Sequence, residues 1–359
     1  MKCSKSIKIL VELMHGLGDT VCALPMLQLL RSTFPDGEIT VLTKFSGAND
    51  IIKSSGIYIN HIICFDIYKD WRKSIFILRD LRGIHFDIGV SSCITPVKKA
   101  KMFMKIVKPK CVVGLQNDNL NFDSLGDKYH FVEANLLAVK KICNIPSQKI
   151  YPRIYPDTQC VNRLRQKIGN DNLQRKIVGV CIGNADYSLK NRFFRKGRVY
   201  TRSWGIQNMT TLIDLLRQQE DLIIILIGGN QEIRLMEYIR EHISMTPKII
   251  DFVGKTTLQE SIALVSLCQC VFGVDTGMQH VASAVGTKTI SVFGPTNPKT
   301  HGAYANNAIF LTSSKSCSRQ FCYGSSSYVD CPNQRVCLST IKPNRAFNAI
   351  INALSTDVR

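Results

Sequence analysis

The sequence has no run of about 20 uncharged apolar residues, which is the length that a membrane-spanning helix needs. Its first apolar segment, residues 7–14, is short and carries Lys8 and Glu12. Neither a secretory signal peptide nor a spanning helix is expected, and the cytoplasm is the predicted compartment. No low-complexity tail is present.

Acidic residues are few. The chain has 27 Asp and Glu residues against 46 Lys and Arg residues, which gives a net charge of +19. This excess predicts an acidic partner, which would be nucleic acid, anionic lipid or a phosphorylated substrate. No nucleic-acid-binding motif and no strip of interleaved basic and aromatic residues is recognisable. A nucleic-acid partner is therefore not expected.

The sequence also lacks a complete dinucleotide-binding fingerprint. Residues 16–20 read Gly-Leu-Gly-Asp-Thr after the first predicted strand, but the third glycine of the fingerprint is missing. This argues against a nicotinamide or flavin cofactor. What is left is Asp19, an acid at the carboxyl end of a strand, where a glycine turn would direct it toward a ligand above the sheet.

The paired spacing of ordinary zinc ligands is absent as well. Of the 14 cysteines, ten lie singly, mostly in apolar surroundings, and reduced core thiols explain most of them. The other four are separated by four, eight and five residues: Cys317, Cys322, Cys331 and Cys337. Two alternatives stay open for this group, a structural metal site or free and partly paired thiols. No metal is assigned to it.

What the chain does contain is an alternation of short apolar strands and amphipathic helices, repeated in two halves. Three prolines, at 146, 152 and 156, interrupt the pattern and are typical of an interdomain linker. We therefore predict an α/β protein with two doubly wound parallel-sheet domains. The predicted segments are a first domain over residues 1–155, a second over 156–341, and a C-terminal helix within 342–359 that has the option of packing back on the first domain.

The most informative stretch lies in the second domain. Residues 271–286 and 287–296 read as strand, loop, small-residue helix, strand and Gly-Pro turn. Asp275 or Thr276 is expected to cap the helix, whose free N–H groups would suit a phosphate. Together with Gly277 and His280, they form a polar cluster at the carboxyl end of a strand, where open α/β sheets bind ligands.

Three motifs occur together, in an order that is typical of one family. They are Gly16-Leu17-Gly18-Asp19, Gly228-Gly229-x-x-Glu232, and Asp275-Thr276-Gly277-x-x-His280 followed by Phe293-Gly294-Pro295-Thr296. Over nearly its whole length the chain resembles glycosyltransferase family nine, the ADP-heptose:lipopolysaccharide heptosyltransferases. The resemblance implies a GT-B fold, in which two Rossmann-like domains face a central cleft. The first domain would bind the acceptor and the second the nucleotide-sugar donor.

The resemblance also implies roles for individual residues. Asp19 matches the catalytic base of an inverting transfer, and Gly16, Gly18 and Thr20 form the acceptor-side loop around it. Glu232 matches an acid that holds the nucleoside ribose. Arg202, before Trp204, stands where the family has a lysine; it keeps the charge but changes the geometry. The remaining donor-binding residues are Asp275, assigned to capping and loop order, Thr276, Gly277 and His280.

We therefore expect a heptosyltransferase-like enzyme without a cofactor or catalytic metal. It would transfer heptose, with ADP-heptose as donor, to a hydroxyl of a phosphorylated lipopolysaccharide intermediate, at the cytoplasmic surface of the inner membrane. Family members often have a cysteine cluster near the C-terminus, and some related autotransporter heptosyltransferases bind iron through one. Two other functions stay open: transfer from another nucleotide sugar or to a protein acceptor, and a non-catalytic basic binding module.

Overall fold

The structure is a computed structural model that describes residues 6–66, 69, 71–95, 97–114, 128–184, 202–315, 317–318, 321–322 and 331–355. The chain divides into two compact units, Met1–Tyr155 and Pro156–Arg359. The sequence also predicts a polar loop at 117–128 and a loop rich in Lys and Arg at 183–203. Residues 117–127 of the first loop and residues 185–201 of the second lie outside the described residues.

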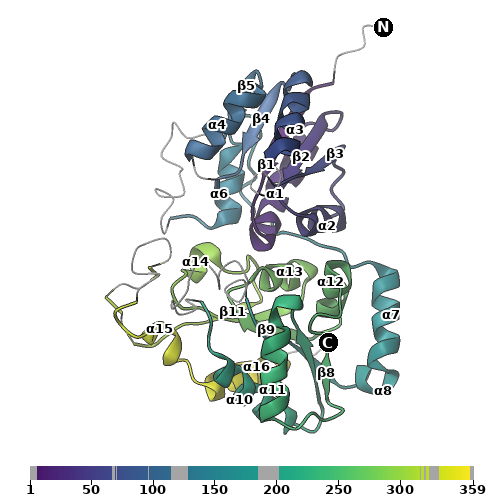
Figure 1. Ribbon diagram of the computed structural model, residues 1–359, viewed down its shortest axis with the longest axis vertical. Helices are drawn as coiled ribbons and strands as arrows, with labels where there is room; N and C mark the ends of the chain where they lie inside the picture. Colours follow the sequence, from purple (N-terminus) through teal and green to yellow (C-terminus); the bar gives the residue numbers. More distant parts are fainter. Residues whose placement is uncertain are drawn as a thin grey trace. The chain divides into compact units, whose positions relative to one another are not determined.

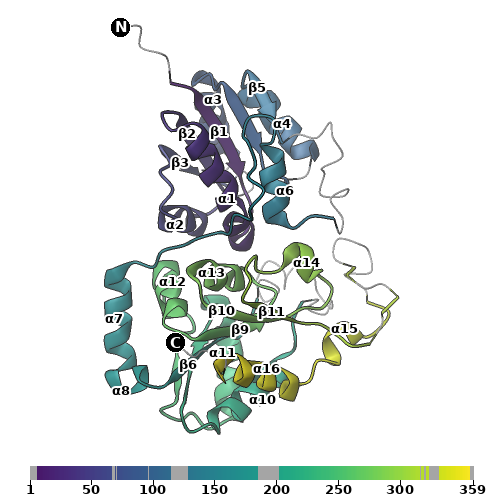
Figure 2. The ribbon, with the colours of Figure 1, turned by 180° about the vertical axis from the view of Figure 1, so that it is seen from behind.

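The first unit has a five-stranded parallel sheet (Figure 1). Its order is β3-β2-β1-β4-β5, and its strands are β1 (Lys8–Leu13), β2 (Glu38–Thr43), β3 (His61–Cys64), β4 (Ile88–Ser91) and β5 (Cys111–Val113). Its helices are α1 (Leu17–Thr33), α2 (Ser46–Ser54), α3 (Trp71–Gly83), α4 (Val97–Val107) and α6 (Phe131–Ala138). Helix α1 packs against α2 and α6 on one face, whereas α3 and α4 contact each other on the other face (Figures 1 and 2).

Helix α1 begins earlier than the sequence predicts. The sequence pattern predicts a glycine turn over residues 16–20 and a helix only from residue 21, but the helix starts at Leu17, with Gly16 as its N-cap. Asp19 therefore belongs to the first turn of the helix and not to the preceding loop. The helix also has no exposed stripe through its middle, because residues 20–27 are all buried between the sheet and the neighbouring helices.

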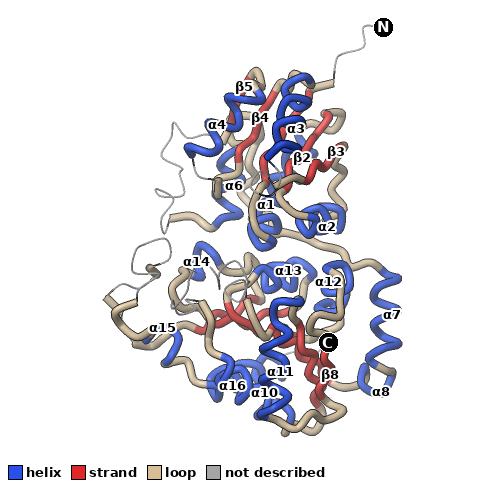
Figure 3. The backbone as a smooth tube through the Cα atoms, viewed as in Figure 1, coloured by secondary structure: helices blue, strands red, loops and turns tan. Residues whose placement is uncertain are grey.

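The second unit has a six-stranded parallel sheet in the order β11-β10-β9-β6-β7-β8. Figure 3 draws its strands in red. Its strands are β6 (Lys176–Cys181), β7 (Leu222–Ile227), β8 (Ile249–Asp251), β9 (Cys270–Val274), β10 (Lys288–Val292) and β11 (Ala308–Leu311). All six residues of β7 are buried, as expected for a parallel strand covered on both faces.

The helices of the second unit lie on both faces of this sheet. They are α7 (Thr158–Ile168), α8 (Asn170–Leu173), α10 (Ile206–Arg217), α11 (Ile233–His242), α12 (Leu258–Ser266), α13 (Gly277–Val285), α14 (Pro298–His301), α15 (Val336–Ser339) and α16 (Pro343–Ser355), with a 3-10 turn at Asn230–Glu232. The C-terminal helix α16 packs against α10, β9 and β10, with Ala346 and Ile350 fully buried. The predicted pair of doubly wound parallel sheets is confirmed.

In both sheets the strand order reverses at one point, between β1 and β4 in the first unit and between β6 and β9 in the second. The carboxyl ends of the strands beside such a reversal form the usual ligand crevice of an open α/β sheet. No helix in the described part of the chain is long and apolar enough to cross a membrane.

Candidate functional site

Asp275 follows β9 directly, at the reversal point of the second sheet. The N-cap of the following helix, α13, is Thr276 and not Asp275. The carboxylate oxygen Oδ2 accepts a hydrogen bond from the Thr296 hydroxyl at 2.8 Å and pairs with Nη1 of Arg202 at 3.4 Å. Asp275 is 8% exposed and Thr296 is fully buried. The hydrogen bond between Thr296 and Asp275 connects the two ends of the 275–296 motif. The capping role predicted for Asp275 is wrong.

Thr276 is the N-cap of α13, but its side chain makes no capping hydrogen bond. Its Oγ1 is buried and has no hydrogen-bond partner among the described residues. The first N–H groups of any α-helix also lack intrahelical partners, and they carry the positive end of the helix dipole. Gly277 is the first helical residue, and the partly exposed His280 lies about one turn further on. These donors are what an anionic oxygen would require.

Arg202 is held by the residues that follow it. The Trp204 side chain is 4% exposed, packs edge-to-face on Phe272 of β9 with ring centroids 5.6 Å apart, and donates its Nε1–H to the Ile341 carbonyl at 2.7 Å. These contacts fix the backbone two residues after Arg202, so the guanidinium is presented beside Asp275 at the carboxyl edge of the sheet.

Glu232 lies at the carboxyl end of β7, in a space that glycines leave for it. Its Oε2 accepts the Gly229 N–H at 2.8 Å, and a Cβ at Gly183 would come within 2.4 Å of its Cγ. Burial raises the pKa of the Glu232 carboxyl, and the Gly229 hydrogen bond offsets only part of this effect. The Glu232 charge adds to the effect of burial in raising the pKa of Cys181 to about 12. The acid therefore lies beside the end of β6.

Asp19 lies at the reversal point of the first sheet. Its Oδ2 accepts the Gly16 N–H at 3.1 Å, which fixes the loop before α1. Its charge also raises the pKa of the Cys93 thiol, although burial of Cys93 is the larger cause. The turn after β4 is therefore close to Asp19. Asp19 is partly exposed.

The other residues predicted for this loop divide into two kinds. Gly16 is exposed and Gly18 is partly exposed, whereas Thr20 is 1% exposed and its hydroxyl donates to the Gly16 carbonyl at 2.9 Å. The Thr20 side chain thus supports the loop internally.

The first unit also contains a hydrogen-bonded group of three polar side chains, Glu12, Thr95 and His15, that the sequence did not predict. The Thr95 hydroxyl lies 2.6 Å from Oε2 of Glu12 and 2.7 Å from Nε2 of His15. Because a carboxylate only accepts, Thr95 donates its one proton to Glu12 and accepts from His15, which places the imidazole proton on Nε2. Glu12 is 3% exposed. The available signal was an acid within an apolar strand.

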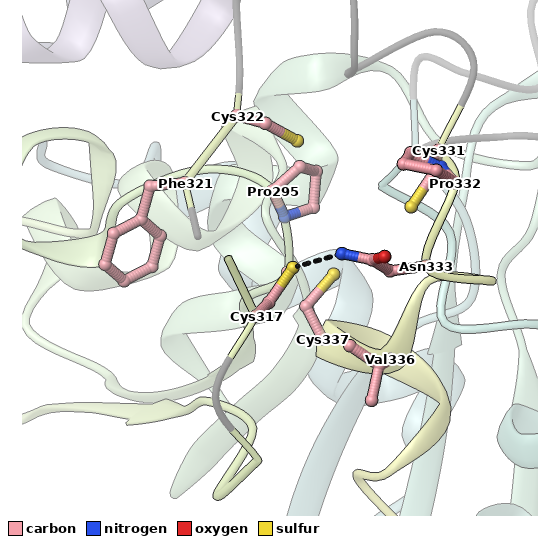
Figure 4. A pocket seen from close by; sticks show the side chains of 10 residues that line it. Pro295, Cys317, Phe321, Cys322, Cys331, Pro332, Asn333, Val336 and Cys337 are labelled. Carbon is pink, nitrogen blue, oxygen red and sulfur yellow. Dashed lines mark hydrogen bonds between the residues drawn. The ribbon is translucent and has the colours of Figure 1, made fainter. Parts of the chain in front are cut away.

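The four clustered cysteines surround one pocket beside Pro295 (Figure 4). None of these four cysteines forms a disulfide, and the Asn333 amide donates to Sγ of Cys317 at 3.2 Å. Burial is the main cause that raises the pKa of the Cys337 thiol to about 11, and repulsion from the other three sulfurs in their thiolate form adds to it. Within the described ranges no three His, Cys, Asp or Glu side chains lie close enough together to hold a metal ion. The pocket adjoins the Gly294–Thr296 segment of the donor motif.

The fold therefore places several predicted donor residues at one edge of the second sheet. Of these, Arg202 and Asp275 are in direct contact. Asp19 belongs to the other unit, so its meeting with the donor residues stays a prediction. The roles of all these residues in binding and catalysis are likewise predictions.

Comparison with known proteins agrees with these observations. Residues 90–328 match the family model described as glycosyltransferase family 9 (heptosyltransferase). The lipopolysaccharide core heptosyltransferase OpsX of Haemophilus influenzae is 22% identical over 82% of this chain and 80% of its own length. The lipooligosaccharide heptosyltransferase 2 of the same species is 26% identical, over 45% of this chain and only 44% of its own length.

Among solved structures, the Escherichia coli ADP-heptose lipopolysaccharide heptosyltransferase II superposes with a TM-score of 0.73 at 16% identity, over 98% of this chain and all of that one. This likeness confirms the GT-B fold class predicted from the motifs. With a family model that covers well over half of its length, the chain belongs to glycosyltransferase family 9.

Proposed function

We propose that the protein is an inverting glycosyltransferase that moves a heptose from ADP-heptose to a hydroxyl of a phosphorylated lipopolysaccharide core or Kdo-lipid intermediate. The observation that carries this proposal is the edge of the second sheet. A buried carboxylate, Glu232, lies there with an arginine, Arg202, and with a helix N-terminus whose Thr276 hydroxyl has no partner in the described part of the chain.

Each group suits a different part of a nucleoside-diphosphate sugar. A buried carboxylate accepts hydrogen bonds from the two hydroxyls of a ribose. The α13 N-terminus and Arg202 supply N–H donors and positive charge for the diphosphate. The interaction of these groups with the diphosphate would strengthen as the leaving diphosphate gains negative charge. They would therefore stabilise the transition state and accelerate the transfer.

In the proposed reaction, Asp19 accepts the proton of the acceptor hydroxyl while the oxygen of that hydroxyl forms a bond to the anomeric carbon of heptose. The bond from that carbon to the diphosphate oxygen breaks, and ADP leaves with the bonding electrons. Attack from the opposite side inverts the configuration. No catalytic metal takes part in this step.

The acceptor is proposed to be anchored in the inner membrane, with the reaction at its cytoplasmic surface. The chain's net charge of +19 supports an anionic acceptor. The printed names of its relatives support heptose and lipopolysaccharide as the substrate class.

A panel of nucleotide sugars tests the donor. ADP-heptose should raise the melting temperature of the protein, and Glu232→Gln should reduce the shift because a neutral amide accepts ribose hydroxyl hydrogen bonds more weakly. Asp214→Asn, at a partly exposed ion pair with Arg217, is a matched control that should leave the shift unchanged. If a UDP- or GDP-sugar stabilises the protein and ADP-heptose does not, the donor is wrong. Transfer to a peptide and not to a lipopolysaccharide fragment would identify a protein acceptor instead.

A further inference from the structure

Helices α3 and α4 expose large apolar side chains that no other element covers within the residues that the structure describes. Four of the ten exposed large apolar side chains in the described part of the protein belong to these two helices: Ile75 (54%), Phe76 (65%), Met102 (56%) and Ile106 (36%). Scattered single apolar side chains on a surface are ordinary, but two pairs on adjacent helices are not.

The pattern along α3 separates an inner from an outer side. Ser74, Leu78 and Leu81 are buried, and both leucines belong to a core cluster that includes residues of β1 and β2. Ile75 and Phe76 lie on the outer side, with exposed Arg72 one turn before them and exposed Arg79 one turn after them.

Helix α4 repeats this pattern. Ala100, Met104 and Val107 are buried, whereas Met102 and Ile106 are exposed. Exposed lysines alternate with these two apolar side chains: Lys98, Lys101 and Lys105.

The two outer sides form one surface, because α3 and α4 contact each other on the same face of the sheet (Figures 1 and 3). We call it the α3–α4 surface; its apolar members are Ile75, Phe76, Met102 and Ile106, and its cations are Arg72, Lys73, Arg79, Arg82, Lys98, Lys101 and Lys105. Asp80 is the one acid in the sequence of either helix.

This combination matches the chemistry of an anionic bilayer. Aromatic and aliphatic side chains insert at the boundary between headgroups and acyl chains, while lysines and arginines contact lipid phosphates. A purely solvated basic face would not expose Phe76 and Met102, and a phosphate-tracking nucleic-acid face has no use for isoleucine and methionine at its centre.

We propose that the α3–α4 surface docks the first unit on the surface of a membrane that contains anionic lipid. The inference rests on the proposed function in one respect: docking on the membrane would bring the enzyme to an acceptor that is anchored there. It names the surface through which the enzyme would reach that acceptor.

Co-sedimentation of the full chain with lipid vesicles tests the proposal. The wild type should bind vesicles of phosphatidylcholine with about 30% phosphatidylglycerol, and should bind pure phosphatidylcholine far more weakly, because the cations need anionic headgroups. Phe76→Ser with Met102→Ser should weaken binding about tenfold. Replacing Lys98, Lys101 and Lys105 by Gln should weaken it about 100-fold and reduce its salt dependence.

Matched controls separate this surface from the overall charge. Met245→Ser removes an exposed methionine of the second unit, and the triple replacement of Lys53, Lys140 and Arg153 by Gln removes three exposed cations of the first unit. Both controls should bind within about twofold of wild type, since they leave the α3–α4 surface intact. Circular dichroism and melting temperature verify that each variant folds.

Three results would overturn the proposal: equal binding to neutral vesicles, equal loss in control and test variants, or a wild-type dimer that Phe76→Ser with Met102→Ser converts to a monomer. The last result would assign the surface to a second copy. Vesicle binding requires neither donor nor acceptor, and transfer to a water-soluble, deacylated acceptor should be unchanged in the surface variants. Failure of the transfer with intact vesicle binding would therefore contradict the proposed function alone.

Discussion

The hydrogen bond between Thr296 and Asp275 allows a quantitative test of how the donor motif is held together. Thr296→Val keeps the side-chain volume but removes the hydroxyl that donates to Asp275 Oδ2 at 2.8 Å. Arg202 would remain as a partner at 3.4 Å. A hydrogen bond to a charged group contributes about 1.5–3 kcal/mol, so we expect a loss of that size. For a unit of this length, the loss corresponds to a melting temperature about 3–12 °C lower.

Thr289 provides the matched control. Thr289 and Thr296 are both 0% exposed, but Oγ1 of Thr289 has no hydrogen-bond partner in the described residues. Thr289→Val should therefore be neutral or stabilising, because it removes a buried polar group that gains nothing from the fold.

Urea unfolding followed by tryptophan fluorescence measures both variants. The chain has two tryptophans, and in a Trp71→Phe background the signal comes from Trp204, which is buried against Phe272 in the second unit. If Thr289→Val costs as much as Thr296→Val, the loss reflects packing of any buried threonine. The hydrogen bond to Asp275 would then not be what stabilises the motif.

Three further predictions concern the two acids and one glycine. Asp19→Asn keeps an oxygen that can accept the Gly16 N–H, so the protein should fold and still show the donor-induced melting shift, while turnover falls about 10²–10⁴-fold; near-wild-type turnover would remove Asp19 as the base. Burial raises the pKa of Glu232, so its favourable contribution is present below the unfolded-state pKa and is lost as pH rises through the folded-state value. Glu232→Gln should therefore flatten the dependence of unfolding free energy on pH above about pH 4, and an unchanged slope would contradict a desolvated acid. Gly183→Ala places a Cβ 2.4 Å from Glu232 Cγ and should cost about 1–3 kcal/mol as well as weaken donor binding; Gly83→Ala, with no atom within 4 Å of its Cβ, is the control that should show neither effect.

Much of the architecture follows from local sequence patterns. Continuous apolar runs such as Leu222–Ile227 can only be buried on both faces, and in an alternating chain this means parallel strands covered by helices. Because parallel strands end at the same edge, Glu232 and Asp275 could be placed near one ligand site from their positions after β7 and β9. The boundaries were less predictable: the start of α1 depends on Gly16 acting as its N-cap, and glycine carries no distinctive capping signal.

Periodicity along the chain is enough to predict which polar residues stand at the ends of strands. Tertiary structure decided what those residues touch. Thr95 is 83 positions from Glu12, and Thr296 is 21 positions from Asp275, so neither contact could be read from local spacing. The same holds for the α3–α4 surface: amphipathic periodicity predicts the helices, but only their packing on one face of the first sheet combines their outer sides. Strand order and helix packing are non-local properties, and they convert separate motifs into sites.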